Sequence, residues 1–217
     1  MSATTAPEPI GRRARAARNE QRILEAARAV LADDPGAPIA AVARHAGVGM
    51  SALYSRYRSK DELLQRLALE GLRRYLDAVQ AALDDDGDPW TAFAGFMRRA
   101  LDAGTSSLTP RFAGTFTATE ELQREARRAY DATLRLLQRA KAAGVLRPDI
   151  DVGDLSLLFE QLQAVRAGDQ RRTAQLRHRY LALVLDGLRQ ASAASLPARP
   201  PTWREISRRY EKKRPAD

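Results

Sequence analysis

Apolar residues recur at three- and four-residue intervals along almost the whole chain, and sustained alternation of β-branched or aromatic residues with polar ones is nearly absent. The first pattern places side chains on one face of an α-helix, whereas the second would indicate β-strands. The sequence therefore predicts an all-α protein. Its 217 residues are enough to bury a substantial core in one or two domains.

Residue types that support metal or thiol chemistry are scarce. The chain has no cysteine, which excludes disulfides, thiolate zinc sites, iron–sulfur ligation and cysteine nucleophiles. Its two histidines, His45 and His178, have no partner at metal-ligand spacing. We expect no metal, no cofactor and no catalytic residues. No apolar run reaches a membrane span and no secretory signal follows the basic N-terminus, so we expect a cytoplasmic protein without a membrane partner.

Helix-boundary signals divide the first part of the chain into short segments. We expect a first helix within residues 18–32, then two short helices over 39–46 and 49–57. Gly47 lies between the short helices and suits the left-handed backbone of a tight turn. Two short helices joined by such a turn are typical of a helix-turn-helix unit, whose second helix enters the DNA major groove.

A long helix is expected from the capping-box spacing of Ser59 and Glu62 to the acidic stop at residues 84–87. About 24 residues form a rod of roughly 36 Å, which is long enough to join two modules. Further helix starts are expected at Asp88-Pro89, Thr109-Pro110, Thr117 with Glu120, Asp151 with Asp154 and Thr202 with Glu205. The helix that starts at Asp151 is expected to run to Gly168, and a last long helix is expected over 171–191.

The basic excess lies at the two ends of the chain. Residues 1–60 hold ten Lys or Arg against five Asp or Glu, residues 61–190 hold nineteen of each, and residues 191–217 hold seven against three. A basic end attached to a neutral body is expected when one module binds a polyanion. An arginine-biased, solvated surface is the equally weighted alternative.

The second short helix carries residue types suited to a base-reading surface. Arg56 can donate two hydrogen bonds to guanine, serines can donate or accept, and Met50 or Ala52 can contact a thymine methyl. Tyr54 and Lys60 are expected to contact phosphates. Taken singly, each of these residues has an ordinary interpretation as packing or solvated charge, and only the set as a whole favours DNA binding.

Residues 47–64, GVGMSALYSRYRSKDELL, resemble the recognition-helix signature of the TetR family of bacterial transcriptional regulators. The matching positions are Gly47, Val48, Leu53, Tyr54, Tyr57, Lys60 and Leu63. Residues 23–27 resemble the family's first helix, and residues 144–155 more weakly resemble the turn before its eighth helix. The resemblance implies an N-terminal three-helix DNA-binding domain, a connecting fourth helix, and a larger helical ligand-binding and dimerisation domain.

Two departures from the family pattern affect the expected DNA contacts. Ala40 and Ala41 stand where the family often has polar residues, and Gly49 stands where it commonly has serine. We therefore assign sequence reading to the second short helix and to a basic arm suited to a minor groove, although the arm could equally be disordered. The predicted contacts are Arg12, Arg13, Arg15, Arg44, Gly49, Met50, Ser51, Ala52, Tyr54, Ser55, Arg56 and Lys60.

With the resemblance included, four regions are expected. They are a flexible basic arm (1–17), the helix-turn-helix domain (18–64), a helical ligand-binding and dimerisation domain (65–194) and a basic tail (195–217) that is either a short docked helix or disordered.

The last two long helices are apolar on more than one face, which favours a two-fold dimer formed as a four-helix bundle over a fully internal core helix. The residues predicted to form this dimer interface are Leu157, Leu158, Tyr180, Leu181, Val184 and Leu188.

Apolar and aromatic residues of the body are candidates for an effector pocket, although aromatic stripes at helical spacing more often form packed core. The predicted lining is Trp90, Phe93, Phe96, Met97, Phe112, Phe116, Tyr130, Leu134, Phe159 and Leu162.

The function that these features favour is a dimeric DNA-binding regulator, a repressor released from a palindromic operator by a small, mostly apolar effector. One alternative is a helical protein that binds nucleic acid without sequence preference. Another is a helical enzyme acting on an apolar substrate, for which Glu120, Glu121 and Glu160 are the only acid–base candidates.

Overall fold

The computed structural model describes residues 9–34, 36–104, 116–189 and 194–208, excluding the side chains of residues 9–16, 32 and 33. In these ranges the secondary structure is α-helical, apart from one isolated antiparallel bridge between Leu146 and Arg189. The predicted all-α fold is confirmed. The chain divides into two compact units, residues 1–67 and 68–217.

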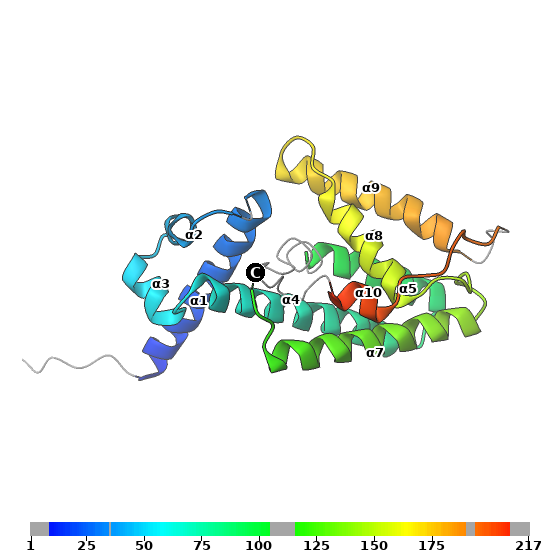
Figure 1. Ribbon diagram of the computed structural model, residues 1–217, viewed down its shortest axis with the longest axis horizontal. Helices are drawn as coiled ribbons and strands as arrows, with labels where there is room; N and C mark the ends of the chain where they lie inside the picture. Colours follow the sequence, from blue (N-terminus) through cyan, green and yellow to red (C-terminus); the bar gives the residue numbers. More distant parts are fainter. Residues whose placement is uncertain (1–8, 35, 105–115, 190–193, 209–217) are drawn as a thin grey trace, which may run out of the picture. The chain divides into compact units, whose positions relative to one another are not determined.

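Figure 1 shows the helices along the chain. They are α1 (Pro9–Asp33), α2 (Ile39–Ala46), α3 (Met50–Arg56), α4 (Lys60–Leu83), α5 (Pro89–Asp102), α7 (Glu120–Ala142), α8 (Val152–Ala164), α9 (Gln170–Leu188) and α10 (Trp203–Arg208). The boundary between the two units falls within α4, so this helix contributes to both.

Three helix boundaries differ from the sequence expectation. Helix α1 begins at Pro9, so the backbone of residues 9–17 is helical where we expected an irregular arm; proline suits a first helical turn because its amide needs no partner there. The cap of α7 is Thr119, whose side chain accepts from the amide of Leu122 at 3.2 Å, and not Thr117. Helix α8 ends at Ala164, before Gly168. The expected start at Thr109-Pro110 lies outside the described residues.

The first unit is a helical core built around the turn at Gly47. Gly47 has φ of 63° and ψ of 37°, and its amide donates to carbonyls at the end of α2. Arg22 of α1 caps the same end through a 2.8 Å hydrogen bond to the carbonyl of Ala46. Apolar side chains from all four helices fill the interior: Ile23, Leu24, Ala27, Leu31, Val42, Ala43, Leu53, Leu63, Leu64 and Leu67.

The second unit has an aromatic centre. Tyr75 of α4, Phe96 of α5 and Phe159 of α8 meet edge to face, with ring centroids 5.4 to 6.4 Å apart. The hydroxyl groups of Tyr75 and Thr133 are hydrogen-bonded at 2.9 Å, and burial raises the pKa of Tyr75 to about 12. Because each ring is held by two others, α4, α5 and α8 are fixed relative to one another within this unit.

The C-terminal segment docks on the second unit. Buried Arg147 pairs with Asp149 at 2.6 Å and donates to the carbonyl of Ala194 at 2.7 Å, while Asp149 also accepts from the amide of Leu196. These hydrogen bonds hold the pKa of Asp149 well below its usual range. Helix α10 lies against α8 (Figure 1), and the ring of Trp203 contacts that of Tyr130 with centroids 4.9 Å apart and planes tilted by 59°. Of the two expectations for the tail, the docked helix is the one observed in residues 203–208.

Gly153→Ala should detach this segment, because the added methyl group would lie 2.1 Å from the backbone oxygen of Pro201. We expect a loss of about 1–3 kcal/mol in the free energy of unfolding and a red shift of Trp203 fluorescence. The control is Gly95→Ala, whose methyl group meets only the flexible end of Arg99. Unchanged emission and stability in Gly153→Ala would contradict the docking.

Candidate nucleic-acid interface

Helix α3 has one buried face and one exposed face. Leu53 is fully buried and Tyr57, which follows the helix, is 3% exposed, whereas Met50 and Tyr54 are 37% and 48% exposed. Two large apolar side chains in solvent on a seven-residue helix are unusual unless they serve an interface. The remaining predicted contacts on or next to this helix are also exposed: Gly49, Ser51, Ala52, Ser55 and Arg56.

Several polar groups of this surface already have partners inside the unit. Ser55 Oγ donates to the carbonyl of Ala52 at 2.9 Å, and Arg56 Nη2 donates to Glu20 Oε2. Lys60 Nζ donates to the carbonyl of Ala37 at 2.8 Å and to that of Gly36 at 3.4 Å. Lys60 therefore joins α4 to the segment between α1 and α2, a structural role that the sequence did not indicate.

The other predicted DNA contacts lie on α1 and α2. Arg44 is exposed in the last turn of α2. Arg12, Arg13 and Arg15 lie on the helical backbone of α1, and their side chains are outside the described part of the chain. Arginines spaced along a helix follow a phosphate backbone more readily than a narrow minor groove, because a helix is too wide to enter that groove.

Three candidates for metal or acid–base chemistry, His178, Glu120 and Glu121, are exposed in the described part of the chain. Among the described residues, no three His, Asp or Glu side chains are grouped so that they could hold a metal ion. His178 pairs with Asp102 at 2.6 Å on an exposed surface. Glu120 and Glu121 are exposed and pair with Arg124 and Arg73. In the same residues no helix is long and apolar enough to cross a membrane.

Most of the predicted pocket residues pack against other side chains in the second unit. Phe93, Phe96, Met97, Phe159 and Leu162 are at most 4% exposed and belong to its core. Trp90 lies under Arg189, whose guanidinium carbon is 4.5 Å from the ring centroid, and Tyr130 contacts the ring of Trp203. Phe116 is buried, and Phe112 is outside the described residues. These described aromatic side chains are therefore packed into or against the core of the second unit.

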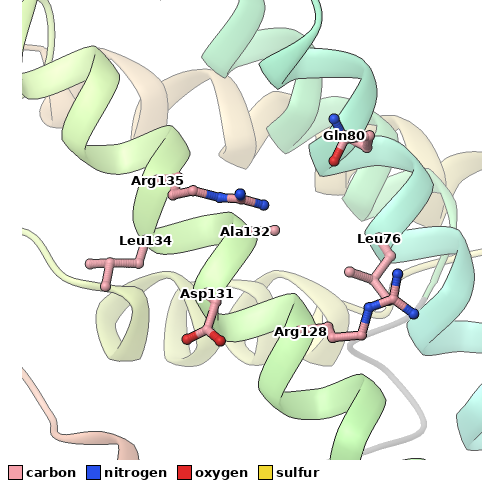
Figure 2. Close-up of a pocket in the computed structure, with 7 residues that line it drawn as sticks. All are labelled: Leu76, Gln80, Arg128, Asp131, Ala132, Leu134 and Arg135. Carbon is pink, nitrogen blue, oxygen red and sulfur yellow. The ribbon is translucent and has the colours of Figure 1, made fainter.

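A groove of about 440 Å³ lies elsewhere, between α4 and α7. It is open to solvent, and in Figure 2 Arg128 and Arg135 extend from α7 toward Leu76 and Gln80 of α4. Asp131, Ala132 and Leu134 complete the lining. Leu134 is the only predicted pocket residue among these seven.

Gln163 is a buried polar residue of the second unit that sequence reasoning missed. Gln163 of α8 is 3% exposed, and its Nε2 donates to the carbonyl of Leu101 at 2.9 Å. Its Oε1 is buried and has no hydrogen-bond partner among the described residues. A buried carbonyl oxygen without a donor is costly, so it favours a molecule that supplies one. A glutamine next to Leu162 in an apolar stripe was the available signal.

The predicted dimer face needs revision. Leu181 and Leu188 are 1% and 4% exposed and lie in the chain's own core, so their side chains cannot contact a partner. By contrast, Tyr180 and Leu183 are 43% and 61% exposed on α9. Leu157, Leu158 and Val184 are partly buried. The exposed apolar face is therefore centred on Tyr180 and Leu183, which the helical repeat places on the side away from the core.

Comparison with known proteins identifies both parts of the chain. Residues 23–67 match the family described as bacterial regulatory proteins, tetR family. Residues 88–190 match the C-terminal domain of SbtR-like transcriptional regulators. No curated protein matches the chain significantly.

Solved structures agree with these matches. A TetR transcription regulatory protein from Mycobacterium vanbaalenii is 30% identical, with a TM-score of 0.53 over 82% of this chain and 98% of that one. SCO0520, a TetR regulator from Streptomyces coelicolor, is 27% identical, with a TM-score of 0.55 over 80% and 99%. LfrR from Mycobacterium smegmatis, in complex with proflavine, shares the fold at 22% identity, with a TM-score of 0.57 over 83% and 99%.

A helix-turn-helix unit followed by a separate helical unit is the architecture of a DNA-binding transcriptional regulator. The chain belongs to the TetR family of bacterial transcriptional regulators.

Proposed function

We propose that this regulator binds a palindromic operator as a dimer and releases it when a small, mostly apolar effector binds the second unit. The observation that carries the proposal is the exposed face of α3, where Met50 and Tyr54 stand in solvent beside small residues and Arg56. A helix with a small, amphipathic outer face can approach base edges closely in the major groove.

The exposed apolar face of α9 supports the proposed dimer. Leu183 at 61% exposure and Tyr180 at 43% would be covered by a second copy, and a two-fold arrangement buries the same face on both chains. Two-fold symmetry in the protein implies inverted half-sites in the operator, with centres one or two helical turns apart.

An effector site in the second unit is supported by its aromatic interior and by the orphaned Oε1 of Gln163. An effector lodged beside Gln163 would offer apolar surface together with one hydrogen-bond donor. LfrR, which shares the fold, was solved in complex with proflavine. Release of DNA requires that the effector bind one conformation more tightly than the other.

Two substitutions test base readout against phosphate contact. Arg56→Ala should cost about 1–3 kcal/mol of operator binding and relax preference at one base pair. Arg44→Ala should weaken operator and scrambled DNA alike and reduce the salt slope by about 1. Fluorescence anisotropy on both duplexes at several salt concentrations measures these effects. The operator is first obtained by selecting bound fragments from random DNA.

Wild-type protein that bound every duplex equally would contradict sequence-specific regulation and favour general nucleic-acid binding. Equal losses on both duplexes for both variants would contradict base readout by Arg56.

A further inference from the structure

Glu20 of α1 binds arginines from two other helices of the DNA-binding unit. Its Oε2 accepts a hydrogen bond from Nη2 of Arg56 at the end of α3, and its Oε1 lies 3.3 Å from Nε of Arg66 on α4. The Glu20 side chain is 20% exposed, whereas those of Arg56 and Arg66 are 43% and 42% exposed. One carboxylate thus connects α1, α3 and α4.

The contact with Glu20 leaves most of the Arg56 guanidinium available. In the described part of the chain no hydrogen bond engages Nε or Nη1 of Arg56. Arginine carries five N–H donors in a rigid plane, and guanine presents O6 and N7 side by side in the major groove. Arg56 can therefore keep Glu20 on Nη2 while its other N–H groups face a base.

We propose that Glu20 is a positioning residue for sequence reading: it holds the Arg56 guanidinium in the orientation in which α3 presents it to a base pair. This inference rests on the proposed function. A free arginine on a surface has many rotamers, and ordering one such side chain on binding reduces affinity by roughly two- to tenfold. Glu20 removes that cost before DNA arrives.

Arg66 helps to fix the Glu20 carboxylate by pairing with its second oxygen. A single exposed ion pair holds its partners weakly, because both side chains can rotate into solvent. Glu20 is different because each of its carboxylate oxygens pairs with a different arginine: Oε2 with Arg56 and Oε1 with Arg66. The negative charge of Glu20 also repels phosphates, so it gives no advantage on random DNA. Ordering of the Arg56 side chain strengthens binding to the operator alone, whereas repulsion of phosphates by Glu20 weakens binding to both duplexes.

The test compares Glu20→Ala with Glu25→Ala. Glu25 lies on the same helix, is exposed, and accepts a 3.2 Å hydrogen bond from Gln21. Glu20→Ala should lower operator affinity roughly two- to tenfold and leave affinity for scrambled DNA unchanged or slightly higher. Glu25→Ala, which removes the same charge, should leave the ratio of the two affinities unchanged. Anisotropy titrations of the full-length protein give both values.

Selection from random DNA measures base preference, which would not change if Glu20 only stabilised the fold. Glu20→Ala should relax preference at the same base pair as Arg56→Ala. In an Arg56→Ala background, Glu20→Ala should cause no further loss on the operator, because its effect acts through Arg56. Glu20→Gln keeps an acceptor oxygen and should show a smaller loss in the same direction, which preserves the test if the alanine variant melts at a lower temperature.

If the wild-type protein prefers an operator, three results would overturn this inference alone. Glu20→Ala could bind DNA as Glu25→Ala does, or it could lose equal affinity for operator and scrambled DNA. Its loss of operator affinity could also persist in the Arg56→Ala background. A wild-type protein with no preferred sequence would overturn the proposed function, and this inference with it.

Discussion

Leu183→Glu is expected to convert the proposed dimer into a monomer and to abolish binding to the proposed operator. Leu183 is the most exposed of the chain's large apolar side chains in the described ranges, at 61%. In a two-fold interface one substitution places two carboxylates in apolar surroundings, where unpaired charge is strongly disfavoured. We expect dimer affinity to fall by more than about 100-fold, the loss typical of a disrupted interface centre.

Loss of the dimer should also lower affinity for the operator, because a monomer can contact only one half-site at a time. Sedimentation velocity at micromolar concentration and anisotropy on the operator measure the two losses. The matched control is Ala182→Glu, an exposed neighbour that the helical repeat places about 100° away on the polar side of α9. Dimers that persist in Leu183→Glu, or dissociate equally in both variants, would contradict the proposed interface.

Phe96→Ala is expected to cost about 3–5 kcal/mol of stability in the second unit. Phe96 is fully buried and contacts the rings of Tyr75 and Phe159 at centroid distances of 5.4 and 6.2 Å. Its truncation removes apolar burial and two edge-to-face contacts, and it leaves a cavity at the point where three helices meet. The melting temperature should drop by roughly 10 °C.

The same variant separates a packed core from a preformed pocket. If Phe96 lined an empty cavity in the effector-free protein, its removal would cost little. Chemical denaturation followed by circular dichroism gives the free energy of unfolding. Leu196→Ala, at a side chain 42% exposed, should change it by less than about 0.5 kcal/mol. A cost below about 1 kcal/mol for Phe96→Ala would contradict the packing described here.

Local signals in the sequence predicted much of the fold. Gly47, Asp88-Pro89 and the pair Asp151 and Asp154 act through neighbouring backbone, and each terminates or caps a helix as expected. The predicted start of α1 was wrong by nine residues, because residues 9–17 carry little apolar periodicity. Helix propensity extends α1 through these residues, and a search for apolar periodicity does not detect that extension.

The partners of the site residues were beyond sequence reasoning. That Arg56 would meet Glu20, 36 positions away, depends on how α1 and α3 cross. Which leucines of α9 face inward also depended on packing: Leu181 and Leu183 are two positions apart, yet one is buried and the other is exposed. An apolar helix predicts that two faces exist, and the tertiary contacts decide which face belongs to the core.

Selection of DNA fragments by the full-length protein from a random library, followed by footprinting of the enriched sequence, tests the central claim most directly. We expect two inverted half-sites whose centres lie one or two helical turns apart, both protected at the same protein concentration. Enrichment of a single unpaired half-site, or of no sequence at all, would contradict paired reading of the major groove by α3.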